Sequence, residues 1–478
     1  MLKRLISISA MWIAILTWWA LPALAEMVVD TAWVRRYDGA AHRDDYCFAT
    51  AIDSSGCVYV TGCSWGSGTD YDYTTIKYYP NGDIAWVRRY DGPEGGSDYA
   101  YAIALYGCEN IYVAGTSGTI KYTSDGSQVW TDSLFDGRAV TVDDSGSVYV
   151  TGPSGTVKYD ANGNQSWVGA WGEVDIGVDT SHNVYVTGGE VYYETVTYYP
   201  DGDTAWLRKY DESVLWDHAS GIDIDDAGNV YVTGTSLGSL YEDYATIKYD
   251  ANGDTLWIRR YDRGRGDDCA TAIAVDASGN VYVTGYGYSM VWMNTAYVTI
   301  KYDSAGNPLW VRHFNVYVGR SKAYALALDS LSNVYVTGSS NVWGYGDYYT
   351  TVGYDSSGNL LWVERYDGPG NLDDVAYAIA LDGSGNVYVT GWSWNGRNYD
   401  YATIKYVQTG RWRGDANGDD VIDIADVIYL INYLFIDGSP PDPLPVGDCN
   451  CDEVVDIADV MYLINYLFIG GSPPHCWG

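Results

Sequence analysis

The 478-residue chain is poor in positive charge, in phenylalanine and in histidine. It has 27 Lys+Arg against 62 Asp+Glu, a formal net charge of −35. A surface this acidic repels phosphate, which excludes generic binding to nucleic acid or to anionic membranes. Only 5 Phe accompany 48 Tyr and 20 Trp, so most aromatic positions have one polar end. The 5 His are scattered and form no H-E-x-x-H pair, so a catalytic metal motif is absent.

No long apolar run occurs after the first 25 residues. Lys3 and Arg4 precede an apolar stretch over 5–21, and Pro22 and Ala23-Leu24-Ala25 follow it. This order predicts a secretory signal peptide over 1–25, and an uncleaved membrane anchor is the alternative. We therefore expect a secreted protein, extracellular or associated with the cell surface, with no membrane span after signal cleavage.

Disulfides are possible in such a compartment, because the chain has 8 Cys. If Asp53 pairs with Cys57 across a hairpin, then Cys47 faces Cys63 on the next strand, which makes Cys47 and Cys63 a candidate disulfide. Cys476 could pair with Cys449 or Cys451.

The segment V-Y-V-T-G recurs throughout the middle of the chain, every 36 to 53 residues. Segments like A-I-A-V-D, T-I-K-Y and W-V-R-R-Y recur with it. Each is short, β-branched or aromatic, and bounded by turns such as Asp276-Ala-Ser-Gly-Asn280, which predicts a strand. Four strands at this period predict one blade of a β-propeller. The final glycines of the eight copies are at 62, 115, 152, 188, 234, 285, 338 and 391.

The two ends of the repeat region complete one another. The Trp strand over 32–37 lacks a preceding T-I-x-Y strand, and the strand over 403–406 lacks a following Trp strand. Pairing them closes a ring and removes an open edge. The fold class is therefore all-β, an eight-bladed β-propeller over residues 26–408 that is closed by the N-terminal strand. The repeats resemble bacterial SBBP propeller repeats over about 30–407. This resemblance implies the propeller fold but says hardly anything about function.

The variable connections of the repeats gather on one rim and are aromatic. Variable loops on one face are typical of a binding face. Exposed Trp and Tyr beside Asp and Asn suit stacking on sugar rings or a protein interface, and the alternative is that they only pack on each other. Asp45, Asp98, Asp268 and Asp374 recur before the first strand of a blade; we expect turn capping rather than a glycosidase pair. The candidate rim residues are Trp65, Tyr71, Trp292, Trp343, Tyr345, Trp392, Trp394 and Tyr399.

The last 70 residues contain two near-copies of an acidic loop followed by V-[IM]-Y-L-I-N-Y-L-F. Oxygen side chains fall at loop positions 1, 3, 5, 9 and 12, with a backbone carbonyl at 7, the pattern of a Ca²⁺ loop. Position 6, usually Gly, is Asp420 and Glu453. The sequence predicts two Ca²⁺ ions, and folding coupled to their binding. The candidate ligands are Asp415, Asn417, Asp419, Val421, Asp423 and Asp426, and Asp448, Asn450, Asp452, Val454, Asp456 and Asp459.

With Asp at position 12 and one apolar helix after each loop, residues 409–478 resemble a type I dockerin, a small α-helical calcium domain. The resemblance implies docking to a cohesin-like partner through positions 10 and 11, which are Ile424, Ala425, Ile457 and Ala458. The alternative is a terminal module whose helices only pack together.

Two functions follow from these observations. The first is a secreted non-catalytic binding or scaffold protein whose rim binds polysaccharide or protein and whose tail docks to a cohesin-like or cell-surface protein. The alternative is a secreted polysaccharide-degrading enzyme, a glycoside hydrolase or lyase, that carries a dockerin.

Overall fold

The structure is a computed structural model that describes residues 26–172, 174–189, 192–210, 217–238, 240–264, 266–289, 294–315, 319–342 and 346–475. It divides into two compact units. One is Val29–Gln408, and the described parts of the other are 26–28 and 409–475. The expected signal peptide over 1–25 lies outside the described residues.

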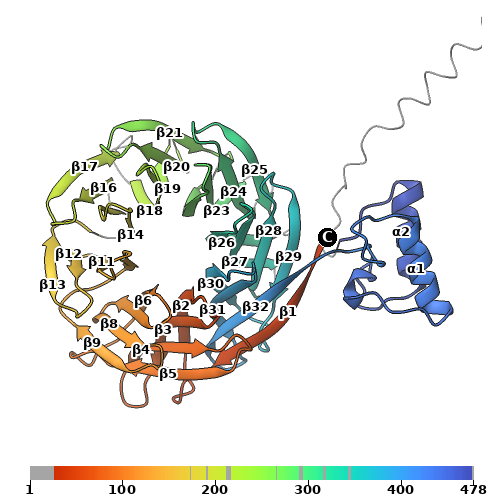
Figure 1. The fold of residues 1–478 in the computed structure, drawn as a ribbon, viewed down its shortest axis with the longest axis horizontal. Helices are drawn as coiled ribbons and strands as arrows, with labels where there is room; N and C mark the ends of the chain where they lie inside the picture. Colours follow the sequence, from red (N-terminus) through yellow and green to blue (C-terminus); the bar gives the residue numbers. More distant parts are fainter. Residues whose placement is uncertain are drawn as a thin grey trace, which may run out of the picture. The chain divides into compact units, whose positions relative to one another are not determined.

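The first unit is a ring of eight four-stranded sheets, or blades, as predicted (Figure 1). Blade 1 contains β2 (Asp45–Ile52), β3 (Val58–Trp65), β4 (Tyr71–Tyr78) and β5 (Ile84–Tyr90), and blade 2 contains β6 (Ala100–Tyr106), β7 (Asn110–Gly115), β8 (Gly118–Thr123) and β9 (Gln128–Asp132). Blade 3 contains β10 (Ala139–Val142), β11 (Val148–Gly152), β12 (Gly155–Tyr159) and β13 (Gln165–Gly169). Blade 4 contains β14 (Asp175–Val178), β15 (Val184–Gly188), β16 (Tyr193–Tyr198) and β17 (Thr204–Tyr210).

Blade 5 contains β18 (Asp217–Ile224), β19 (Val230–Leu237), β20 (Glu242–Tyr249) and β21 (Thr255–Tyr261), and blade 6 contains β22 (Asp268–Val275), β23 (Val281–Ser289), β24 (Asn294–Tyr302) and β25 (Pro308–Phe314). Blade 7 contains β26 (Gly319–Leu328), β27 (Val334–Val342), β28 (Tyr348–Tyr354) and β29 (Leu360–Tyr366). Blade 8 contains β30 (Asp374–Leu381), β31 (Val387–Trp394) and β32 (Tyr399–Trp412), together with β1 (Met27–Tyr37).

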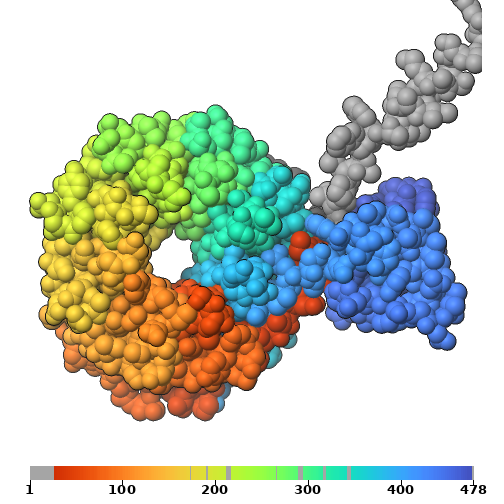
Figure 2. All heavy atoms as spheres, in the orientation of Figure 1, coloured from red at the N-terminus to blue at the C-terminus, as the bar shows by residue number. Residues whose placement is uncertain are grey.

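In each blade the first strand lies nearest the axis and the last at the circumference, so we call the four the inner, second, third and outer strands (Figure 1). The ring is open along its axis (Figure 2). The turns between inner and second strands, and between third and outer strands, share one face, called here the turn face. The remaining connections lie on the opposite, loop face.

Blade 8 contains both ends of the repeat region. Its strand order is β1-β32-β31-β30, so the N-terminal strand supplies the outer strand of the last blade. This confirms the predicted closure. The pairing leaves no blade with an unpaired third strand, which removes the edge that an open array would expose.

The tryptophan of each outer strand packs against its own blade and the next one. Trp257, for example, lies 6.2 Å from Tyr231 of its own second strand and 6.1 Å from Tyr302 of the next blade, measured between ring centroids. Its indole N–H donates to the Ser304 carbonyl of that next blade at 3.2 Å. Neighbouring blades are thus joined by a buried ring and a hydrogen bond, which explains why a Trp recurs at this position.

The predicted Cys47–Cys63 disulfide is wrong. Both cysteines are buried and free. A β-bulge at Phe48 shifts the register of β2 against β3, so that Cys63 lies opposite Tyr46 and Cys47 opposite Gly62. The Cys47 thiol instead donates to the Thr61 carbonyl at 3.4 Å.

The second unit is helical. It contains α1 (Ile424–Phe435), the 3₁₀ turn η1 (Leu444–Val446), α2 (Ile457–Ile464) and the π-helical η2 (Asn465–Ile469). Val427, Leu430, Val460 and Leu463 form its core together with the free Cys449. Cys451 is disulfide-bonded, and Cys476 lies outside the described residues. Across the described ranges, the helices are too short or too polar to cross a membrane.

Candidate functional sites

The first acidic loop is folded around its own carboxylates. Asp415 Oδ1 accepts from the Gly418 and Asp419 amides at 2.9 and 3.0 Å. Asp419 Oδ1 accepts from the Val421 amide at 3.0 Å. Asp426, at position 12, accepts from the Asn417 amide at 3.0 Å and so ties the end of the loop to its beginning.

The second loop repeats this arrangement. Asp448 Oδ1 accepts from the Asp452 amide at 3.2 Å, and Asp459 Oδ1 from the Asn450 amide at 3.1 Å. Position 6 has φ of 66° at Asp420 and 68° at Glu453, the left-handed conformation that usually requires Gly. Asp420 and Glu453 therefore keep the backbone conformation that Gly has at this position, although this conformation costs a non-glycine residue some free energy.

Each loop runs directly into a helix through its ligand candidates. Asp423 caps α1 and Asp456 caps α2, each in a capping box with the Asp three residues later. Those partners, Asp426 and Asp459, are fully buried, and burial raises the pKa of both, that of Asp426 to about 6. Concentrated, partly buried carboxylate oxygens fit a hard divalent cation such as Ca²⁺, which would offset their repulsion.

The expected docking residues lie at the start of the two helices and are exposed. Ile424 and Ile457 are 48% and 50% exposed, and Ala425 and Ala458 are exposed beside them. The structure adds five exposed apolar residues further along these helical segments, which the sequence did not predict, namely Ile428, Phe435, Met461, Phe468 and Ile469. A spacing of four residues from Ile424 and Ile457 would have found Ile428 and Met461.

Five of the eight rim candidates are described, and all five are half-buried. Trp65 lies 4.9 Å from Tyr71, and Tyr399 lies 4.7 and 4.9 Å from Trp392 and Trp394, all between ring centroids. The other three, Trp292, Trp343 and Tyr345, lie outside the described residues.

A second row of rings, which the sequence reasoning missed, lies on the inner strands. Six inner strands contain a β-bulge, and the bulge residue is aromatic in four consecutive blades, 7, 8, 1 and 2. A bulge redirects the side chain of its extra residue. These four rings form a chain with successive centroid distances of 5.0, 6.0 and 5.6 Å. They are Tyr324, Tyr377, Phe48 and Tyr101.

The two rows form one surface. Tyr46 lies 6.0 Å from Tyr71 and 5.8 Å from both Trp392 and Tyr399. Tyr99 continues the contact to Tyr71 at 5.5 Å. We call this network the aromatic arc; it comprises Tyr324, Tyr377, Trp392, Trp394, Tyr399, Tyr46, Phe48, Trp65, Tyr71, Tyr99 and Tyr101. Its members are half-buried, so each is partly accessible to solvent.

The recurrent aspartates before the inner strands have turn partners. Asp45, Asp98 and Asp374 each accept from a glycine amide six residues earlier at 2.6 Å, and Asp268 accepts from the Arg263 amide at 2.5 Å. They are at most 4% exposed, so a bulky substrate does not reach them. These contacts favour turn capping over a glycosidase pair.

Two G-x-S-x-G segments, at 62–66 and 234–238, contain Ser64 and Ser236. Both serines are fully buried and accept from the guanidinium groups of Arg89 and Arg260 at 2.7 and 2.8 Å. A nucleophilic serine of this motif needs an exposed hydroxyl at a strand-to-helix turn, so these segments are structural.

The family-model matches agree with this architecture. Residues 217–242, 310–342 and 362–397 match the SBBP beta-propeller repeat, and residues 413–468 match the dockerin type I domain. The comparison with curated proteins found no match. Among solved structures, Sqt1 of Chaetomium thermophilum is 10% identical, with a TM-score of 0.56, over 80% of this chain and 98% of its own. A Bacteroides caccae protein of unknown function is 10% identical, with a TM-score of 0.34, over 64% and 93%.

Proposed function

We propose that this chain, in which SBBP propeller repeats precede a dockerin type I domain, is a secreted binding module that attaches to a cohesin through its C-terminal domain and binds polysaccharide on its propeller. The aromatic arc is the observation that carries the polysaccharide proposal. Eleven half-buried rings, continuous over blades 7, 8, 1 and 2, offer a surface on which successive sugar rings can stack.

The chemistry around the arc supports a neutral polar ligand. Burial, and after it the charge of the nearby Asp44, raises the pKa of the Tyr46 and Tyr71 hydroxyls, that of Tyr71 to about 12. Such hydroxyls stay protonated and can donate to sugar oxygens. Arg43 lies over Trp65, 4.8 Å from the ring centroid, and Arg138 over Tyr101 at 4.4 Å, which supplies further donors.

The dockerin unit supplies the attachment. Its two loops would each hold one Ca²⁺ through the predicted ligands, and the ion would fix the start of each helix. Ile424 and Ile457 then present similar apolar surfaces to a cohesin. The two copies are nearly equivalent, so the partner could be engaged in either of two orientations.

A glycan array probed with the mature chain in Ca²⁺, run beside a reducing-sugar release assay, tests the propeller. We expect retention of polysaccharide without sugar release. Release of reducing ends would replace binding by hydrolysis, whereas failure to retain any glycan would leave the arc as a protein interface and overturn the polysaccharide proposal.

A further inference from the structure

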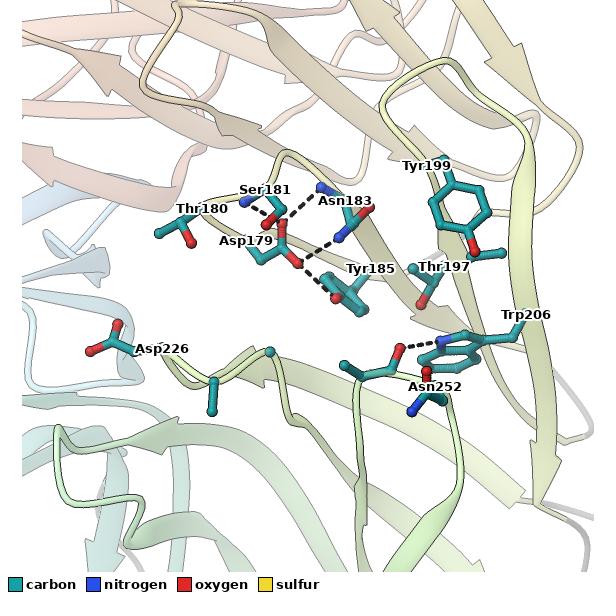
Figure 3. Close-up of a pocket in the computed structure, with 14 residues that line it drawn as sticks. Asp179, Thr180, Ser181, Asn183, Tyr185, Thr197, Tyr199, Trp206, Asp226 and Asn252 are labelled. Atoms are coloured by element: carbon teal, nitrogen blue, oxygen red, sulfur yellow. Dashed lines mark hydrogen bonds between the residues drawn. The ribbon is translucent and has the colours of Figure 1, made fainter.

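A cavity of about 370 Å³ lies on the turn face between blades 4 and 5 (Figure 3). Its mouth is formed by exposed residues of the surrounding turns, including Tyr199, Asp226 and Asn252. Its floor is buried, with Tyr185 1% and Thr197 2% exposed. The 14 lining residues include two aspartates and no basic residue.

In six blades the residue equivalent to Thr197 is a lysine that crosses the same junction. Its ammonium lies 4.8–5.3 Å from the ring centroid of the second-strand tyrosine. In five of them it also donates to a turn carbonyl of the next blade at 2.9–3.4 Å. In five of these junctions the lysine ammonium therefore lies between an aromatic face and a carbonyl of the next blade. The six are Lys77, Lys121, Lys158, Lys248, Lys301 and Lys405.

Blade 7 also lacks this lysine but fills the space differently. Gly353 stands at the position, and a Cβ there would lie 2.9 Å from the ring of Trp362. Trp362 is fully buried and stacks on Tyr335 with centroids 5.7 Å apart and planes at 29°. The junction of blades 7 and 8 is thus packed by an indole.

Blade 4 keeps the surroundings of the lysine without the lysine. Tyr185 is present, and the Ala251 carbonyl, equivalent to the lysine acceptors, is held by the Trp206 N–H at 3.1 Å and retains a second lone pair. Asp179 also lines the cavity, and its hydroxyl partner is Tyr185 at 2.9 Å (Figure 3).

The charge and polarity of the cavity match a cation. Burial lowers the pKa of Lys248 and Lys301, and the charges of Asp225 and Asp276, the counterparts of Asp179 in blades 5 and 6, offset part of this lowering. The Thr197 hydroxyl is buried at the floor and has no hydrogen-bond partner among the described residues. A buried unpaired hydroxyl is costly and indicates a missing polar partner.

We propose that this cavity binds a primary alkylammonium group, whose nitrogen takes the place of the missing lysine ammonium over Tyr185 and donates to the Ala251 carbonyl. A lysine side chain of a partner protein and a free aliphatic diamine share this chemistry. The site is remote in sequence from the aromatic arc and from the dockerin loops, so it does not depend on the function proposed above.

Calorimetric titration of the full chain with n-butylammonium chloride, at constant ionic strength, tests the site. We expect a dissociation constant on the order of 1 mM, because a ligand with so few atoms makes few contacts. Uncharged n-butanol should show no comparable binding. Thr197→Lys, which copies six other blades, should fill the cavity and weaken binding at least tenfold. Thr204→Lys, which adds the same charge at an exposed position outside the cavity, is the matched control and should retain binding within a few-fold.

Equal heats for the wild type and Thr197→Lys, or equal heats for butylammonium and butanol, would overturn the proposal. If Thr197→Lys does not fold, Tyr185→Leu removes the aromatic face and should weaken binding, whereas unchanged binding would count equally against it. Blocked lysine amide and cadaverine separate the two sources. Tighter binding of the first indicates a protein lysine, and tighter binding of the second a free diamine.

Discussion

Arg36 Nη2 lies 2.9 Å from Asp400 Oδ2, an ion pair between residues 364 positions apart in the chain. Arg36 belongs to the N-terminal strand β1 and Asp400 to β32, the two strands that close the ring. The same guanidinium donates to the Ser393 carbonyl of β31 at 2.9 Å. One side chain therefore joins three strands of the closing blade.

We expect Arg36→Ala to destabilise the propeller by about 3 kcal/mol, because it leaves the buried Asp400 carboxylate without its cation. Urea unfolding followed by tryptophan fluorescence measures the loss. Arg89→Ala is the matched control, since Arg89 pairs with Asp72 at 2.8 Å within blade 1.

Hydrogen exchange separates the two variants. Arg36→Ala should increase exchange first in residues 27–37 and 399–408, and Arg89→Ala in blade 1. Increased exchange of the closing strands in both variants alike would show that closure does not depend on the Arg36–Asp400 pair.

The blade count and the closure could be predicted from the sequence because they depend on order alone. Four recurring segments define a blade, and the unmatched strands at 32–37 and 403–406 have each other as partners. The Cys47–Cys63 prediction failed because it assumed an unbroken register. One extra residue, Phe48, offsets all pairs beyond it, and no local residue preference marks that bulge.

Bulges of this kind explain why four of the eleven rings of the aromatic arc were not predicted from the sequence. In a regular strand, Phe48 and Tyr101 belong to a period-two pattern and look like ordinary inner-strand residues. Only the bulge aligns them with Tyr324 and Tyr377 along four blades. The rim loops were recognisable because they differ in length between blades, whereas the bulge residues lie within the inner strands.

The bulge position also offers a direct test of the arc. Tyr377→Ala removes the ring that joins Tyr324, Phe48 and Trp392, and should weaken polysaccharide binding about 2- to 10-fold, the value of one aromatic contact. Thr271→Ala changes the equivalent bulge residue of blade 6, outside the arc, and should leave affinity unchanged. Affinity electrophoresis with the polysaccharide identified on the array measures both, and equal losses would argue against the arc.

Asp268 should make the propeller more stable in mild acid. Burial first, and then the charges of Asp262 and Asp243, raise its pKa from 3.8 to about 7. Because the folded state binds the proton more tightly, the stability contribution of this group is complete below about pH 4 and is lost as the pH rises through about 7. Asp268→Asn removes the titration, so the unfolding free energy of the variant should fall less between pH 4 and 8 than that of the wild type. Parallel pH profiles from urea unfolding would contradict this.

Removal of calcium should unfold the C-terminal unit and leave the propeller folded. The two loops place several carboxylates close together, and two of them, Asp426 and Asp459, are fully buried, so without a cation their repulsion and desolvation oppose folding. Chelation should therefore abolish the helical circular dichroism of α1 and α2 and cohesin binding, while tryptophan fluorescence of the propeller stays native.

Two substitutions locate the effect. Asp426→Ala should remove one of two expected Ca²⁺ ions in calorimetric titration and weaken cohesin binding. Asp250→Ala is the control, because Asp250-Ala-Asn-Gly-Asp254 repeats the first five loop residues but continues to Ile258 and Tyr261, where a calcium loop needs oxygen ligands. In the structure Asp250 Oδ1 instead accepts from the Asn252 and Asp254 amides at 2.9 and 2.8 Å, as a hairpin turn requires. Calcium uptake that survives Asp426→Ala, or that falls in Asp250→Ala, would place the ions elsewhere.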